Sequence, residues 1–105
     1  MEDRLTAEQV RRFIEGQRVR SLDPDTGELA ATITYRGDGT CVAEFADGST
    51  DEGRYGFAGD GYWTRYATFR DGTENRFYLV RLGPDRAQAH FDDGRRAFLQ
   101  ISPAG

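Results

Sequence analysis

After Gly16 the sequence consists of short runs in which apolar and polar residues alternate, and turn residues separate each run from the next. Eight such runs fall between residues 17 and 101, and alternation with a period of two is typical of half-buried β-strands. The connections are too short for the crossover helix that neighbouring parallel strands require. The pattern therefore predicts an antiparallel β-meander over about residues 17–101.

Asp-Gly pairs mark most of the breaks between the runs. They stand at 38–39, 47–48, 60–61, 71–72 and 93–94, and Gly83-Pro84-Asp85 fills the long gap between the last two. Asp-Gly between alternating runs is a strong hairpin signal, because a two-residue type I′ turn needs positive φ angles. These pairs are therefore interpreted as hairpin corners and not as metal ligands.

A helix is predicted before the strands, over about residues 7–15. Thr6 followed by Gln9 has the pattern of a capping box, in which each side chain bonds to the other residue's backbone N–H. Leu5 and Val10 stand where a hydrophobic staple forms across the first turn of a helix.

The chain is expected to form one mainly β domain over residues 1–105, with the short N-terminal helix followed by seven or eight antiparallel strands. Hydrophobic residues make up 37% and charged residues 30% of the sequence, an ordinary globular balance. Eight short strands in sequence order are enough to close into a small β-barrel, complete or incomplete. A strongly curled open sheet capped by the helix is the alternative.

Charge and composition exclude several classes of protein. The net charge is −4 and charges of both signs are interspersed, which argues against a duplex nucleic-acid partner. No apolar run approaches the ~20 residues that a membrane-spanning helix needs. The acidic N-terminus lacks an apolar signal segment, so a cytoplasmic location is expected, with export after removal of a signal as the alternative.

Catalytic and metal-binding residues are not expected. Cys41 and His90 are the only cysteine and the only histidine, so the chain cannot supply four zinc ligands of N or S type. Cys41 falls on the apolar side of its run and His90 on the opposite side from Ala89. The loop 23–28, "DPDTGE", resembles the start of an EF-hand, but its Gly stands fifth instead of sixth. No cofactor is predicted.

The hairpin over residues 62–81 is the most informative segment. A two-residue turn at 71–72 would pair position 67 with 76 and position 63 with 80. One face then carries the four candidate ligand- or partner-binding residues: Trp63, Arg65, Arg76 and Tyr78. They are assigned to the outside because the other face pairs Tyr and Thr with Phe and Leu. Such a cluster suits an anionic or aromatic ligand, single-stranded nucleic acid or a second protomer; stabilisation of the hairpin alone is the favoured alternative.

Small residues are frequent on the presumed inner faces of the strands. Either they let the barrel close tightly around larger side chains, which is favoured, or they leave room for a small apolar ligand. The residues concerned are Ala31, Ala43, Ala87, Ala89 and Ala97. In the last run, Ala97, Leu99 and Ile101 are assigned to the inner face.

The helix-then-meander arrangement resembles small uncharacterised bacterial lipocalin-like proteins. The matching segments are "LTAEQVRRFIEGQRV", "DEGRYGFAGDGYWTRY" and "DDGRRAFLQI". Many of those proteins carry a cysteine pair near the central hairpin, whereas this chain has Cys41 alone. The resemblance implies a calycin-type barrel and binding of a small ligand, and it supplies no catalytic residues.

The leading functional hypothesis is a non-catalytic β-barrel that binds a small apolar or aromatic ligand or a protein partner, including a second copy through the hairpin 62–81. One alternative is an enzyme with an Arg and carboxylate site inside the barrel. The other is a module that binds single-stranded nucleic acid through the Arg and aromatic hairpin.

Overall fold

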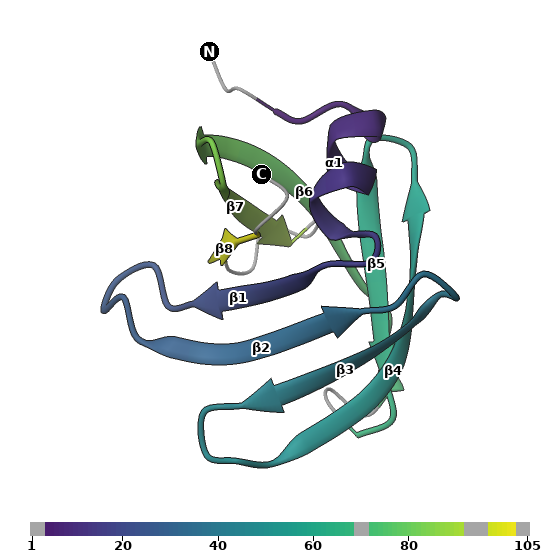
Figure 1. Ribbon diagram of the computed structural model, residues 1–105, viewed down its shortest axis with the longest axis vertical. Coiled ribbons are helices and arrows are strands. Elements are labelled where there is room, and N and C mark those ends of the chain that lie inside the picture. Colours follow the sequence, from purple (N-terminus) through teal and green to yellow (C-terminus); the bar gives the residue numbers. More distant parts are fainter. Residues whose placement is uncertain (1–3, 69–71, 92–96, 103–105) are drawn as a thin grey trace.

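A computed structural model describes residues 4–68, 72–91 and 97–102 of the chain. One helix precedes eight strands (Figure 1): α1 (Ala7–Ile14), β1 (Arg18–Leu22), β2 (Leu29–Tyr35), β3 (Thr40–Phe45), β4 (Thr50–Ala58), β5 (Gly61–Tyr66), β6 (Asn75–Gly83), β7 (Arg86–Phe91) and β8 (Ala97–Ile101). The helix ends one residue earlier than predicted.

The strands form a closed antiparallel barrel in sequence order. Each strand pairs with the next, and β1 pairs with β8 through Arg20–Ile101, Ser21–Gln100 and Leu22–Leu99. The predicted meander is confirmed, and the alternative of an open sheet is wrong. Closure satisfies the backbone hydrogen bonds that the two edge strands of an open sheet would expose.

The first two Asp-Gly pairs, in the β2–β3 and β3–β4 hairpins, are corners, as predicted, but their geometry differs from a two-residue turn. In the β2–β3 connection Arg36 N donates to Thr40 O and Gly39 N donates to Arg36 O, which leaves a three-residue loop. Gly39 takes a φ of 89°, the left-handed conformation that this loop requires at its last position. The Asp38 carboxylate accepts bonds from the backbone N and the Oγ1 of Thr40.

The β3–β4 connection repeats this arrangement. The Asp47 carboxylate accepts hydrogen bonds from the backbone N and the Oγ of Ser49, and Gly48 has a φ of 90°. Between β4 and β5 the turn residues are Gly59 and Asp60, one position earlier than expected, because Ala58 pairs with Gly61. Asp71 and the pair 93–94 lie outside the described residues.

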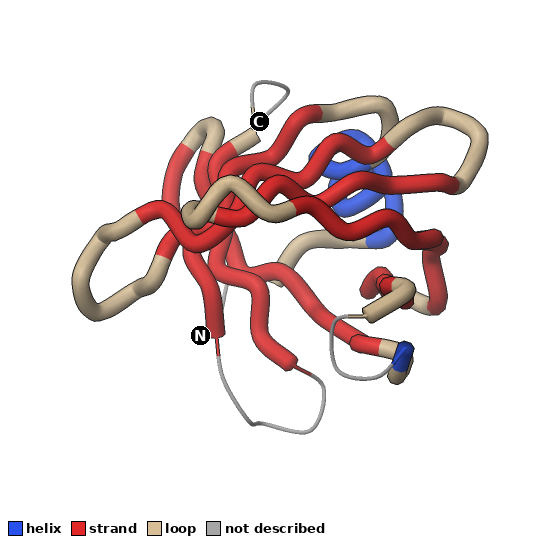
Figure 2. Tube along the Cα trace, turned by 90° about the horizontal axis from the view of Figure 1, so that it is seen from below, coloured by secondary structure: helices blue, strands red, loops and turns tan. Residues whose placement is uncertain are grey.

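Helix α1 covers one end of the barrel (blue in Figure 2). Its predicted capping box is present, since Thr6 Oγ1 accepts from Gln9 N and Gln9 Oε1 accepts from Thr6 N. The helix buries Val10, Phe13 and Ile14 completely. At the far end of the chain, Ser102 Oγ donates to the Phe13 carbonyl over 2.8 Å, so the end of β8 is tied to the helix.

The β5–β6 pairing confirms the predicted faces but not the predicted register. Trp63 pairs with Arg76 and Tyr62 with Phe77, a shift of four positions from the register that a turn at 71–72 would give. Because β5 ends at Tyr66 and β6 begins at Asn75, the connection is longer than a two-residue turn. A shift by an even number leaves each side chain on its predicted face.

The inner face of β8 was assigned wrongly. Ala89 faces inward on β7 and pairs with Phe98, which places Phe98 and Gln100 inside and Leu99 and Ile101 outside. Apolar residues occur on both faces of this strand. Three of them, Ala97, Leu99 and Ile101, alternate on one face, which led to the wrong choice of inner face. The barrel interior therefore receives an amide where an aliphatic side chain was expected.

Candidate functional site: a cavity inside the barrel

The barrel interior contains a cavity of about 250 Å³ that is partly open to solvent, and no residue of α1 lines it. Its wall is contributed by β1, β2, β3, β5, β6, β7 and β8, and aromatic side chains dominate it. The lining residues are Ser21, Ala30, Ala31, Ile33, Tyr35, Ala43, Phe45, Tyr62, Thr64, Tyr66, Phe77, Phe91, Phe98 and Gln100. None of these fourteen side chains is charged at neutral pH.

One side of the cavity is a continuous row of aromatic rings. Tyr62 stacks on Phe77 with ring centroids 4.9 Å apart, and Phe77 lies 4.7 Å from Phe91. Phe91 contacts Phe98 edge to face at 6.2 Å, and Tyr35 contacts Tyr62 in the same way at 6.3 Å. The rings come from five strands that are adjacent or face one another, so the row is a product of barrel closure.

The space exists because small side chains stand on β2 and β3. Ala31 and Ala43 are buried and line the cavity, and Ala30 adds to the same side. The expectation of a filled interior is therefore wrong in this half of the barrel. Ala87 and Ala89 are also fully buried but do not line the cavity, and the side chain of Ala97 lies outside the described part of the structure.

Apart from the tyrosine hydroxyls, polar side chains enter the cavity wall at two places. Thr64 is buried beside Asn75, whose Nδ2 donates to Thr64 O and Thr64 Oγ1, each at 3.3 Å. Ser21 and Gln100 face each other across the β1–β8 pairing, and Gln100 Nε2 donates to Ser21 Oγ over 3.0 Å. These groups can orient a ligand that the apolar surface would otherwise hold in any direction.

The tyrosines of the wall are held in their neutral form. Burial raises the pKa of Tyr35, Tyr62 and Tyr66 above the ordinary value of a phenol. A neutral phenol places no charge in the cavity. The site is thus suited to binding and carries no pre-ionised nucleophile or base among these tyrosines.

Cys41 and His90 do not meet. Cys41 is buried on the inner face of β3, as predicted, and burial raises the pKa of its thiol to about 11. His90 lies on the outer face of β7, where its ring stacks on Tyr78 with centroids 5.0 Å apart. The two side chains lie on opposite sides of the barrel wall, so they form no catalytic pair.

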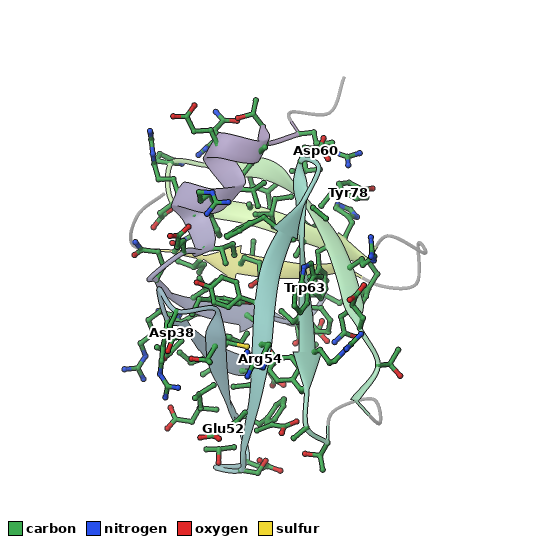
Figure 3. The ribbon with its side chains drawn as sticks, turned by 90° about the vertical axis from the view of Figure 1, so that its right-hand side faces the viewer. Asp38, Glu52, Arg54, Asp60, Trp63 and Tyr78 are labelled. Carbon is green, nitrogen blue, oxygen red and sulfur yellow. The ribbon has the colours of Figure 1, made fainter. Side chains whose placement is uncertain are left out.

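The four residues predicted to bind a ligand or partner lie on the outside of β5 and β6, here called the β5–β6 surface (Figure 3 labels Trp63 and Tyr78). The Trp63 indole packs flat over Gly56, where an added Cβ would lie only 2.7 Å from its ring atoms. Arg65 and Arg76 both bind Glu74, at 3.5 and 2.7 Å. These side chains are therefore neighbours, and each has a partner within the chain.

Tyr78 lies apart from Glu74, close to the N-terminal segment. The Arg4 guanidinium stands 4.3 Å from the centre of its ring and also binds Asp60 over 2.8 Å. Residues 4–5 run beside β6 at this point, since Leu5 N donates to Leu79 O. The β5–β6 surface thus consists of two local sets of contacts.

Metal ligands do not gather within the described ranges, where no group of three or more His, Cys, Asp or Glu residues could hold an ion. In the loop before β2, Asp23 Oδ1 accepts from the backbone N of Asp25 and Thr26, so that carboxylate closes a turn. No helix in the described part of the chain is long and apolar enough to cross a membrane.

Comparison of the chain with protein-family models, with curated proteins and with solved structures finds no match. The cavity is therefore interpreted from its own residues.

Sequence reasoning found Ala31 and Ala43 but missed Ser21, Phe98 and Gln100. Gln100 and Ser102, which follows β8, are two positions apart, and both are buried although both are polar. Gln100 was missed because polar residues of the strands were expected on the outer face.

Proposed function

We propose that the protein is a non-catalytic binding protein that holds a small apolar or aromatic ligand inside its barrel. The observation that carries the proposal is the cavity of about 250 Å³ with its row of aromatic rings. Eight-stranded up-and-down barrels, lipocalins among them, are of a size that holds one small ligand, which supports a lipocalin-like role. A bacterial source and a cytoplasmic location stay predictions from the sequence.

The cavity volume indicates the size of the ligand. A cavity of about 150 Å³ lined by aliphatic and aromatic side chains binds benzene, which has six carbon atoms. By proportion, 250 Å³ corresponds to about ten non-hydrogen atoms, the size of two fused rings. Ligands of this size bind with about 5 to 8 kcal/mol, a Kd between about 0.1 mM and 1 µM.

The other functional hypotheses receive less support. An enzyme with an Arg and carboxylate site would need charged groups in the cavity, and the fourteen lining residues carry none. On the β5–β6 surface, Glu74 binds the two arginines that would contact a nucleic acid or a second protomer. These alternatives therefore remain predictions, and neither is supported by a site as well defined as the cavity.

Calorimetric titration with naphthalene tests the proposal. The wild-type protein should bind one equivalent, and Ala43→Phe should weaken binding more than tenfold, because a phenyl ring would occupy more than half of the cavity. Val42→Phe is the matched control, since Val42 is the adjacent residue on the outer face and should bind as the wild type does. Urea unfolding establishes that both variants are folded, and Ala31→Phe serves if Ala43→Phe is not.

Absence of naphthalene binding by the wild-type protein would contradict the proposal. So would a folded Ala43→Phe variant that binds naphthalene as tightly as the wild type does, because the ligand would then lie elsewhere.

A further inference from the structure

Ser21 and Gln100 form a polar pair in a cavity wall that is otherwise made largely of aromatic and aliphatic side chains. They come from opposite ends of the chain and meet where β1 and β8 close the barrel. Ser21 is 7% exposed and Gln100 3% exposed, so water reaches neither freely. A core position beside four phenylalanines would ordinarily hold an apolar residue, which makes the pair a feature that needs an explanation.

The hydrogen bonds of the pair are incomplete. Gln100 Nε2 donates to Ser21 Oγ, but Gln100 Oε1 is buried without a hydrogen-bond partner among the described residues. Buried carbonyl oxygens in folded proteins are nearly always paired, because leaving one unpaired is unfavourable. Ser21 Oγ accepts the bond from Gln100, which leaves its own O–H able to donate. The β1–β8 seam thus holds an unpaired acceptor and a hydroxyl that can donate side by side, next to the cavity.

The charge of the cavity restricts the ligand further. A carboxylate or an ammonium group entering this space would lose its water and find no oppositely charged side chain among the lining residues. A hydroxyl group can donate one hydrogen bond and accept another, which matches Gln100 Oε1 and the Ser21 hydroxyl together.

We propose that the barrel selects neutral two-ring aromatic alcohols, whose hydroxyl donates to Gln100 Oε1 and accepts from the Ser21 hydroxyl. This inference rests on the proposed function, because it assigns an orientation to a ligand held in the same cavity. The rings lie against the aromatic row, and the hydroxyl points to the β1–β8 seam.

Four probes that share one ring system test the selection by calorimetry: naphthalene, 2-naphthol, 2-methoxynaphthalene and 2-naphthoate. We expect 2-naphthol to bind about tenfold more tightly than naphthalene, since it satisfies a buried acceptor that naphthalene leaves unpaired. The methoxy compound should show no such gain because it cannot donate. The carboxylate should bind most weakly.

Gln100→Leu removes the acceptor and keeps an apolar side chain of similar size. In this variant the preference for 2-naphthol over naphthalene should fall to within about twofold, while naphthalene itself still binds. The ratio of the 2-naphthol affinity to the naphthalene affinity is measured within one variant, so a substitution that weakens the binding of both ligands equally does not change it. Ser21→Ala, which removes the donor and leaves the amide, should reduce the preference in part and serves if Gln100→Leu does not fold.

The possible outcomes separate this inference from the proposed function. If no probe binds, the proposed function fails, and the inference with it. If naphthalene binds as tightly as 2-naphthol to the wild-type protein, the selection by Ser21 and Gln100 is wrong and the proposed function stands. A tenfold preference that persists in folded Gln100→Leu would also overturn the inference.

Discussion

The three tyrosines of the cavity wall predict how the free energy of unfolding depends on alkaline pH. Burial raises the pKa of Tyr35, Tyr62 and Tyr66, so they stay neutral in the folded protein where a phenol in water ionises near pH 10. In the unfolded chain they lose their protons at about pH 10. The unfolded state therefore binds fewer protons above that pH, and stability falls as pH rises.

The size of the effect follows from the number of groups. Each proton that only the unfolded chain has lost lowers the free energy of unfolding by about 1.4 kcal/mol per pH unit. These three tyrosines give a slope of up to about 4 kcal/mol per pH unit above pH 10, and Tyr55, whose pKa is also raised by burial, adds to it. A domain of this size is stable by about 5 to 15 kcal/mol, so the protein should unfold within about one to four pH units above that point.

The sequence makes this measurement unusually clean. All 14 basic residues are arginine, so no lysine titrates in the alkaline range. Cys41 contributes an earlier fall above about pH 9, because its pKa is raised to about 11, and a Cys41→Ala background removes it. Urea unfolding followed by far-ultraviolet circular dichroism between about pH 8 and pH 11.5 gives the slope, which Tyr62→Phe should reduce by about a quarter to a third.

The burial of the tyrosines would be refuted if stability stayed constant to beyond pH 11. It would also be refuted if ultraviolet absorbance showed all three groups ionising near pH 10 while the circular dichroism of the folded protein persisted.

Three further predictions concern the frame around the cavity. Gly56→Ala should displace the Trp63 indole that covers Gly56, which should lower the free energy of unfolding by about 1–3 kcal/mol and shift tryptophan emission to longer wavelength. Gly53→Ala is the control, because it should destabilise the protein without that shift. Unchanged emission in Gly56→Ala would contradict the packing of Trp63 on Gly56. Phe13→Ala should lower the free energy of unfolding by about 3–5 kcal/mol, because this side chain of α1 is fully buried. A loss below about 1 kcal/mol in urea unfolding would show that the helix does not close the barrel. Thr6→Ala should cost about 1 kcal/mol through loss of the helix cap; no measurable loss would mean that the cap does not persist in solution.

Local patterns in the sequence were sufficient for the elements of the fold. The alternation of residues predicted the strands, and Thr6 with Gln9 predicted where the helix begins, because these signals act over a few neighbouring residues. Barrel closure was reached by counting strands. The register of β5 against β6 was missed because the strands end at Tyr66 and begin at Asn75, so the connection is longer than the two-residue turn that the Asp-Gly pair suggested.

The candidate site was harder to predict because it depends on contacts between distant parts of the chain. Gln100 meets Ser21 across 79 positions, and only barrel closure brings them together. The residues chosen from the sequence, such as Trp63 and Tyr78, are large and conspicuous, but the structure places them outside the cavity. The alanines were recognised, yet whether they leave space depends on the side chains opposite them.

The most direct test of the central claim is to locate a bound ligand by nuclear Overhauser contacts between naphthalene protons and the methyl groups of the protein. Contacts with the methyl groups of Ala31 and Ala43, and none with Ala89, which is equally buried but outside the cavity wall, are the predicted result. Contacts with the Trp63 indole in their place would move the binding site to the β5–β6 surface and contradict the account.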